Sequence, residues 1–207
     1  MSASQNTPIK LVILISGSGS NLAAILANIK TGRLNAQILG VISNRSNAYG
    51  LTIAEQADLP RHVYRTKDYS DQPSFEAAIA KQIDAYQPDL IILAGFMKIL
   101  SAEFVTHFFP RIINIHPSLL PKFKGLNTHQ RALDQGEKEH GATVHVVTPD
   151  LDSGPIIAQS RVEVKDDDDA QSLARRVLSA EHKLYSEAID RIVDGRFSLY
   201  SPGNHPL

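Results

Sequence analysis

Short hydrophobic runs alternate with segments of helical periodicity along most of the chain. Residues 10–16, 36–43 and 89–96 are nearly continuous runs rich in Ile, Leu and Val, and residues 61–65 and 111–117 are two shorter candidates of the same kind. Apolar runs of this length, without polar alternation, are typical of strands buried on both faces. They predict a parallel sheet covered by helices.

Helical periodicity fills the intervals between these predicted strands. It is clearest in residues 74–86, where Phe75, Ile79, Ile83 and Tyr86 recur at the spacing of one helix face. The predicted helices are residues 20–30, 48–58, 74–86, 101–108, 128–136 and 169–195. This alternation predicts an α/β fold with a mostly parallel, twisted, Rossmann-like sheet and helices on both faces.

The pattern changes in the C-terminal part of the chain. Residues 142–150 and 155–164 are predicted strands with no long helix between them. Such strands pair antiparallel with each other or with the sheet edge. A long amphipathic helix follows over residues 169–195, and Gly195 is suited to end it.

Composition indicates a single domain and excludes several classes of function. The 207 residues, 43% of them hydrophobic, suffice for one hydrophobic core. Because the sequence contains no evident repeat or linker, we expect one domain over residues 1–207, with a core of about residues 10–195 and short tails. The net charge of −1 disfavours a nucleic-acid partner, and the lack of cysteine excludes disulfides and thiolate catalysis. No apolar run suits a signal peptide or membrane span, which predicts a cytoplasmic protein without membrane contact.

A glycine-rich loop, ISGSGSNLAAIL, joins the first predicted strand to the first helix. Gly17 and Gly19 permit backbone conformations closed to other residues, and the amides of Gly19, Ser20 and Asn21 would form an anion site at the helix N-terminus. A dinucleotide fingerprint is incomplete, because the third glycine and the acidic residue after the second strand are missing. A monophosphate fits better. Arg45 leaves an NADP-dependent reductase as an alternative, and a tight turn without ligand is another.

The segment INIHPSLLPKFKG ends the fifth predicted strand with two polar residues. Asn114 and His116 are two positions apart, so their side chains point to the same side of the strand, and Pro117 ends it. Ligands of open α/β sheets bind outside the carboxyl ends of the strands. An amide and a protonated imidazole placed there would stabilise the oxyanion formed when a nucleophile adds to a carbonyl.

A carboxylate near His116 would favour its charged, donating form. Asp150 and Asp152, in the Pro- and Gly-bounded loop between the two predicted C-terminal strands, are candidates, and the residue pattern does not choose between them. No serine or cysteine nucleophile with a matching base is evident, so we expect no covalent intermediate.

Three further histidines, His129, His140 and His145, do not have the spacing of a zinc site. The sequence therefore predicts no metal.

Two longer strings carry a family resemblance. NIHPSLLPKFKG, followed by HGATVHVVTPDLDSGPII, resembles the 10-formyltetrahydrofolate-dependent formyltransferases. LISGSGSNL, LAGFMKILS and the pair Glu181 and His182 are similar to the branch that formylates glycinamide ribonucleotide in de novo purine synthesis. The resemblance spans about residues 10–195. It implies formyl transfer from 10-formyltetrahydrofolate to the amine of glycinamide ribonucleotide, without a required metal.

The resemblance also implies roles for single residues. Asn114 and His116 would polarise the formyl group, and Asp152 rather than Asp150 would keep His116 protonated. The residues expected to bind glycinamide ribonucleotide are Gly19, Ser20, Asn21, Leu22, Ala23 and Glu181. Those expected at the folate are Met97, Lys98, Ile99, Leu100 and Asn114. The loop over residues 118–129 would close over the site.

One position departs from the family pattern. Gln72 stands where many relatives carry an arginine near the folate, which leaves Lys67 or Lys98 as alternative contacts. Lys98 replaces an arginine of some relatives and keeps the charge without the bidentate fork.

Related activities remain alternatives to the amine formyltransferase. Deformylase and methionyl-tRNA formyltransferase resemble the same core with additional domains, and a non-catalytic phosphate-binding module would not need the Asn114 and His116 pair. For partners we expect small molecules only, and a monomer or weak homodimer.

Overall fold

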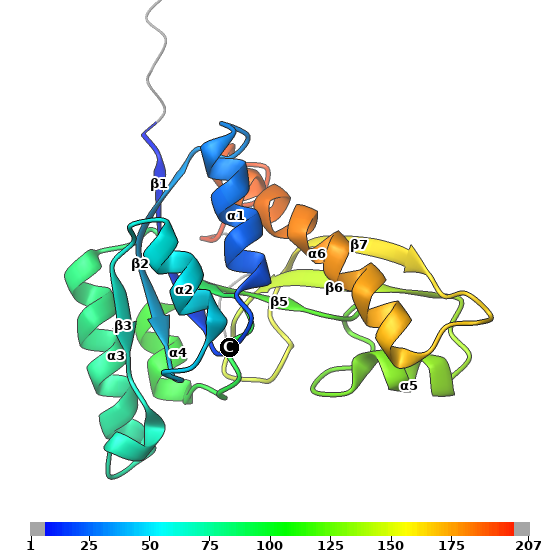
Figure 1. Cartoon of the computed structure of the whole chain (residues 1–207), viewed down its shortest axis with the longest axis horizontal. Helices are drawn as coiled ribbons and strands as arrows, with labels where there is room; N and C mark the ends of the chain where they lie inside the picture. The colour runs from blue at the N-terminus through cyan, green and yellow to red at the C-terminus, as the bar shows by residue number, and fades with distance from the viewer. Residues whose placement is uncertain (1–6, 201–207) are drawn as a thin grey trace, which may run out of the picture. The chain divides into compact units, whose positions relative to one another are not determined.

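The computed structural model describes residues 7–200, and the chain divides into two compact units between Ile99 and Leu100 (Figure 1). The first unit contains a four-stranded parallel sheet with strand order β3-β2-β1-β4. Its elements are β1 (Ile9–Ile15), α1 (Ser20–Lys30), β2 (Ala36–Ser43), α2 (Tyr49–Gln56), β3 (Arg61–Val63), a 3-10 turn (Thr66–Asp68), α3 (Gln72–Tyr86) and β4 (Leu90–Leu93).

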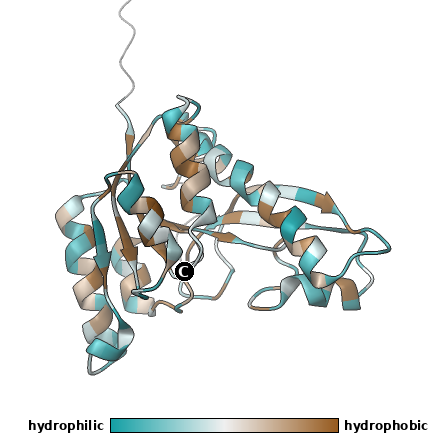
Figure 2. Ribbon diagram, in the orientation of Figure 1, coloured by the Kyte–Doolittle hydropathy of each residue, from teal (hydrophilic) through white to brown (hydrophobic). Residues whose placement is uncertain are grey.

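The central strands of the first unit are buried because hardly a polar residue interrupts them. Leu11, Val12, Ile13, Leu14 and Ile15 of β1 are fully buried. Figure 2 shows hydrophobic residues along β1 and on α1. The chain steps from β1 outward to β3 through α1 and α2, and returns to β4 through α3. Since such crossovers are right-handed, α1 and α2 cover one face of this sheet and α3 covers the other.

The second unit contains three antiparallel strands. β5 pairs with β6, and β6 pairs with β7. α6 packs on β6 and β7, and the hydroxyl of the fully buried Tyr185 on α6 donates to the carbonyl of Ile113 on β5 at 3.2 Å. The elements of this unit are α4 (Ala102–Phe108), β5 (Ile112–His116), α5 (Thr128–Asp134), β6 (Glu139–Val146), β7 (Ile156–Glu163) and α6 (Ala170–Val193).

The α/β class, the parallel strands and the antiparallel C-terminal strands confirm the sequence-based expectation. The start of β6 differs from it. β6 begins at Glu139 instead of residue 142, because Glu139, His140 and Gly141 pair with β7 although they are not apolar. The single domain over residues 1–207 stays a prediction, and its tails lie partly outside residues 7–200. No helix within residues 7–200 has the length and hydropathy needed to cross a membrane.

Gly19 sets how closely the glycine loop approaches α2. Its φ of 71° lies in the left-handed region, and a Cβ at this position would lie 2.5 Å from the Cα of Gly50. The amide of Gly50 in turn donates to the carbonyl of Gly17 at 3.0 Å. Two backbones therefore meet at van der Waals distance, which only glycine allows.

Gly19→Ala should destabilise the protein more than Gly32→Ala. Both glycines have φ of 71°, but no atom lies within 4 Å of a Cβ at Gly32. We expect Gly32→Ala to lower the free energy of unfolding by about 1 kcal/mol through backbone strain alone. Gly19→Ala should cost at least about 2 kcal/mol more, because a backbone must also move. Urea unfolding of both variants measures the difference, and equal losses would contradict the close approach.

Candidate active site

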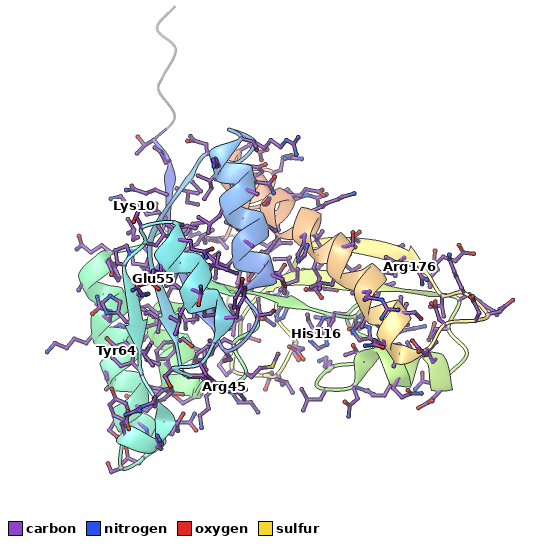
Figure 3. The ribbon with its side chains drawn as sticks, in the orientation of Figure 1. Lys10, Arg45, Glu55, Tyr64, His116 and Arg176 are labelled. Carbon is purple, nitrogen blue, oxygen red and sulfur yellow. The ribbon has the colours of Figure 1, made fainter. Side chains whose placement is uncertain are left out.

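β5 places Asn114 and His116 on one side of the strand, and β6 lies against that strand. The antiparallel register sets Asn114 opposite His145 and His116 opposite Thr143. Figure 3 labels His116 in the second unit, and its side chain is 7% exposed. The carboxyl end of β5 is thus a largely dry, polar site built by two neighbouring strands.

Both ring nitrogens of His116 face oxygen atoms. Nε2 donates to the carbonyl of Phe123 at 2.9 Å, and Nδ1 lies 3.4 Å from Oδ2 of Asp152. A carbonyl and a carboxylate oxygen only accept hydrogen bonds, so protons on both nitrogens satisfy both contacts. The geometry therefore suits the cationic imidazolium, the form that donates to a developing oxyanion.

Asp152 connects three parts of the second unit through one carboxylate. Oδ2 also accepts from the amide of Gly125 at 2.9 Å, and Oδ1 lies 3.7 Å from Nε2 of His145. The backbone of Asp152 is left-handed, with φ of 47°, and its side chain is 8% exposed. Asp150 is exposed. Of the two aspartates left open by the residue pattern, the structure places Asp152 beside His116.

His145 was missed as a site residue, and it fixes the orientation of Asn114. Its Nδ1 lies 2.9 Å from the carbonyl of Val146 and therefore carries the proton. Burial lowers the pKa of His145, so the ring is neutral and Nε2 accepts from Nδ2 of Asn114 at 3.3 Å. One N–H of Asn114 is held in this way and the other remains for a ligand. The sequence showed only an alternating position in a strand, because its partner depends on the β5–β6 register.

The loop after β5 is anchored at both ends. Thr143 donates to the carbonyl of Ser118 at 2.7 Å and accepts from the amide of Leu120 at 3.0 Å. Thr128 donates to the carbonyl of Pro117 at 2.7 Å. Between these anchors the Phe123 carbonyl covers His116. The loop is thus positioned to change the surroundings of the imidazole, and closure of the segment 118–129 over the site stays a prediction.

The glycine loop belongs to the first unit and presents a helix N-terminus. Gly19 is the residue before α1, and neither a side-chain cap nor an acidic residue occupies the first turn. The amide of Ala23 donates to the Gly19 carbonyl at 2.9 Å, so the amides before it are outside the helical hydrogen-bond pattern. Of the other predicted residues, Asn21 and Leu22 are buried, and Ser20 and Ala23 are partly buried. The geometry suits an anion.

The predicted folate segment crosses the boundary between the units. Met97 and Ile99 in the first unit are exposed, whereas Lys98 and Leu100, the latter in the second unit, are partly buried. Gln72 donates through Nε2 to Glu76 at 2.8 Å and to the carbonyl of Ile99 at 3.0 Å. Gln72 therefore holds the backbone of this segment through one hydrogen of its amide nitrogen, and the other hydrogen goes to the Glu76 carboxylate on α3.

Glu181 lies buried on α6, in the second unit. The structure thus brings Asn114, His116 and Asp152 together, whereas the glycine loop lies in the first unit. Within residues 7–200, no three histidine, aspartate or glutamate side chains are grouped so that they would hold a metal ion.

Comparison with known proteins identifies the family. Residues 9–189 match the family described as formyl transferase. The chain belongs to this family. Phosphoribosylglycinamide formyltransferase of Escherichia coli (strain K12) is 43% identical over 190 residues, which cover 92% of this chain and 90% of the relative. The trifunctional purine biosynthetic protein adenosine-3 of Homo sapiens is 42% identical over 94% of this chain and 19% of its own length.

Solved structures agree with this assignment. Phosphoribosylglycinamide formyltransferase from Coxiella burnetii is 50% identical, with a TM-score of 0.88 over 91% of this chain and 89% of the other. Glycinamide ribonucleotide transformylase 1 from Symbiobacterium toebii is 43% identical, with a TM-score of 0.90 over 95% and 93%. The predicted family and α/β fold class are therefore confirmed.

Acid should destabilise the fold through His140. Burial, the neighbouring His129 ring 5.2 Å away, and His116 lower the pKa of His140 to about 4. The unfolded chain therefore binds more protons between about pH 6.5 and 4, so stability falls as the pH drops through this window. The loss should reach up to about 3 kcal/mol.

Unfolding of His140→Leu at several pH values measures this contribution. The variant should lose much of the acid dependence, while the exposed His107→Gln should keep it. An unchanged pH slope in His140→Leu would contradict the assignment.

Proposed function

We propose that the chain transfers the formyl group of 10-formyltetrahydrofolate to the amine of glycinamide ribonucleotide, a step of de novo purine synthesis. The formyl transferase family uses a formyltetrahydrofolate co-substrate, and the relatives from Escherichia coli and Coxiella burnetii named above are phosphoribosylglycinamide formyltransferases. The observation that carries the proposal is the meeting of Asn114 and Asp152 with the buried His116 in a member of this family.

The reaction proceeds by direct attack on the formyl carbon. The amine nitrogen forms the new C–N bond, and the carbonyl oxygen becomes an alkoxide that accepts from Asn114 and His116. Collapse of the intermediate breaks the bond to N10 of the folate, which leaves with a proton while the attacking amine loses one. Asp152 holds His116 in its donating form and assists this proton movement. Holding both substrates in line contributes about 7–11 kcal/mol in favourable cases.

The oxyanion takes the place of the Phe123 carbonyl on His116. In the structure this carbonyl occupies Nε2 at 2.9 Å, the distance expected of the transition-state contact. Substrate binding therefore requires a shift of the loop after β5. Asn114 needs no such change, because His145 already holds one of its N–H groups.

The substrates are bound by the residues that the family resemblance indicates. The amides at Gly19, Ser20 and Asn21, with Leu22 and Ala23, receive the phosphate and ribose of glycinamide ribonucleotide, and Glu181 contacts the same substrate. The folate is bound by Met97, Lys98, Ile99, Leu100 and Asn114. The enzyme needs no metal, acts on small molecules in the cytoplasm without nucleic acid or membrane, and is a monomer or weak homodimer.

Hydrolysis of the same folate is a second candidate. A formyltetrahydrofolate deformylase from Pseudomonas putida KT2440 is 30% identical, with a TM-score of 0.84 over 94% of this chain and 68% of the other. The same oxyanion site would then serve a water molecule instead of an amine.

Release of tetrahydrofolate separates these activities. With 10-formyltetrahydrofolate, we expect release only when glycinamide ribonucleotide is present, together with one formylated product per tetrahydrofolate. Release at the same rate without the ribonucleotide would assign the deformylase, and no release under either condition would refute both.

Variants of the three site residues test their roles. His116→Ala and Asn114→Ala should each lower kcat by about 10²–10³, the usual cost of one oxyanion donor. Asp152→Asn should cause a similar loss, because His116 loses its anionic partner. Asp150→Asn is the matched control and should keep kcat within about twofold, since it is exposed. Near-normal turnover of His116→Ala would contradict the oxyanion role.

A further inference from the structure

Residues 97–99 belong to the proposed folate segment, and they lie outside helix and strand. Met97 is 66% exposed and Ile99 is 73% exposed, so two large apolar side chains face solvent from irregular backbone. The ladder that pairs β4 with β1 ends at Leu93. Other contacts must therefore hold this backbone in one conformation, because a free loop samples many.

The first anchor is the hydroxyl of Ser16, the residue that follows β1. Its Oγ accepts from the amide of Met97 at 2.7 Å and donates to Oδ1 of Asn44 at 2.6 Å. The amide of Ser16 also donates to the carbonyl of Gly95 at 3.1 Å. Ser16 is 2% exposed and directly continues the buried part of β1. These bonds therefore tie the start of the segment to the buried centre of the sheet.

The second anchor is the side-chain amide of Gln72, the first residue of α3. Nε2 donates to the carbonyl of Ile99 at 3.0 Å and to Oε1 of Glu76 at 2.8 Å. Glu76 is 3% exposed and lies one helical turn further on, which fixes this amide. Asp71 and Ser74 form a capping box around Gln72, so its backbone is fixed as well.

The two anchors hold the amide of residue 97 and the carbonyl of residue 99. A backbone fixed at both points presents Met97 and Ile99 in one arrangement before a ligand arrives. Gln72 carries no charge, and both hydrogens of its amide nitrogen are used within the protein. Its contribution is therefore to the conformation of this segment.

We propose that Ser16 and Gln72 are positioning residues for the folate, an inference that rests on the proposed function. They hold residues 97–99 in the conformation that binds the folate. Without either anchor, folate binding must also order the segment, and the free energy of this ordering lowers the affinity. The chemical step on the bound substrates does not depend on them.

The test measures kcat, KM for 10-formyltetrahydrofolate and, by calorimetry, Kd of tetrahydrofolate, which carries no formyl group to transfer. In Gln72→Met and in Ser16→Ala, both KM and Kd for the folate should rise about threefold to tenfold, the usual effect of one lost hydrogen bond. kcat should stay within about twofold. A role in folding alone would not raise KM while leaving kcat unchanged.

The chain offers a matched control for each variant. Gln82→Met removes another partly buried glutamine of α3, whose Oε1 accepts from the hydroxyl of Tyr64 at 3.4 Å. Ser43→Ala removes another buried hydroxyl at a strand end, which donates to the carbonyl of Arg45 at 2.8 Å and accepts from its amide at 3.1 Å. Neither set of bonds involves residues 97–99, so both controls should keep KM and Kd for the folate within about twofold.

The outcomes separate this inference from the proposed function. Unchanged KM and Kd for the folate in Gln72→Met and Ser16→Ala would overturn the inference, and so would equal rises in the two controls. A fall of kcat at unchanged KM would also overturn it, because it would assign both residues to the chemical step. A raised Kd in the variants, without turnover by the unchanged chain, would support the anchors and refute formyl transfer. Gln72 is partly exposed, so Gln72→Met still decides the question if Ser16→Ala does not fold.

Discussion

The candidate site depends on one buried carboxylate. Asp152 faces Nδ1 of His116 at 3.4 Å, accepts from the amide of Gly125 at 2.9 Å, and lies 3.7 Å from His145. An unpaired carboxylate with 8% exposure would be costly, and the contacts with His116 and the Gly125 amide offset that cost. The same contacts orient the imidazole and join the loop after β5 to the β6–β7 connection. The geometry of the candidate site and its local stability therefore have one origin.

Two histidines in this cluster suit opposite charge states because their surroundings differ. His116 meets oxygen acceptors at both nitrogens, which suits a cation. His145 gives its one proton to a backbone carbonyl and accepts from Asn114, which suits a neutral ring. Burial lowers the pKa of His145, which favours the neutral ring. A charged His145 would present a second donor to the amide and turn Asn114 away from the position of the oxyanion.

Much of this arrangement could be predicted from the residue pattern, and the rest depends on contacts between distant segments. The apolar strands, the antiparallel C-terminal strands and the common side of Asn114 and His116 follow from periodicity. The choice of Asp152 over Asp150 came from family resemblance alone, because two turn aspartates look alike in a sequence. His145 was missed because it is paired with Asn114 by the β5–β6 register, and the sequence of neither strand determines that register. The sequence indicated only that Gln72 lacks the charge of the arginine found in many relatives. Its hydrogen bond to the carbonyl of Ile99 could not be predicted, because the two residues are distant in the sequence.

The central claim is that Asp152 holds His116 as a donor at both ring nitrogens. Nitrogen-15 NMR of the labelled imidazole of His116 at neutral pH tests it most directly. Both ring nitrogens should show the chemical shifts of protonated N–H groups, and Asp152→Asn should convert one of them to the shift of an unprotonated nitrogen. An unprotonated nitrogen already present in the unchanged chain, or identical spectra in the two proteins, would contradict the account.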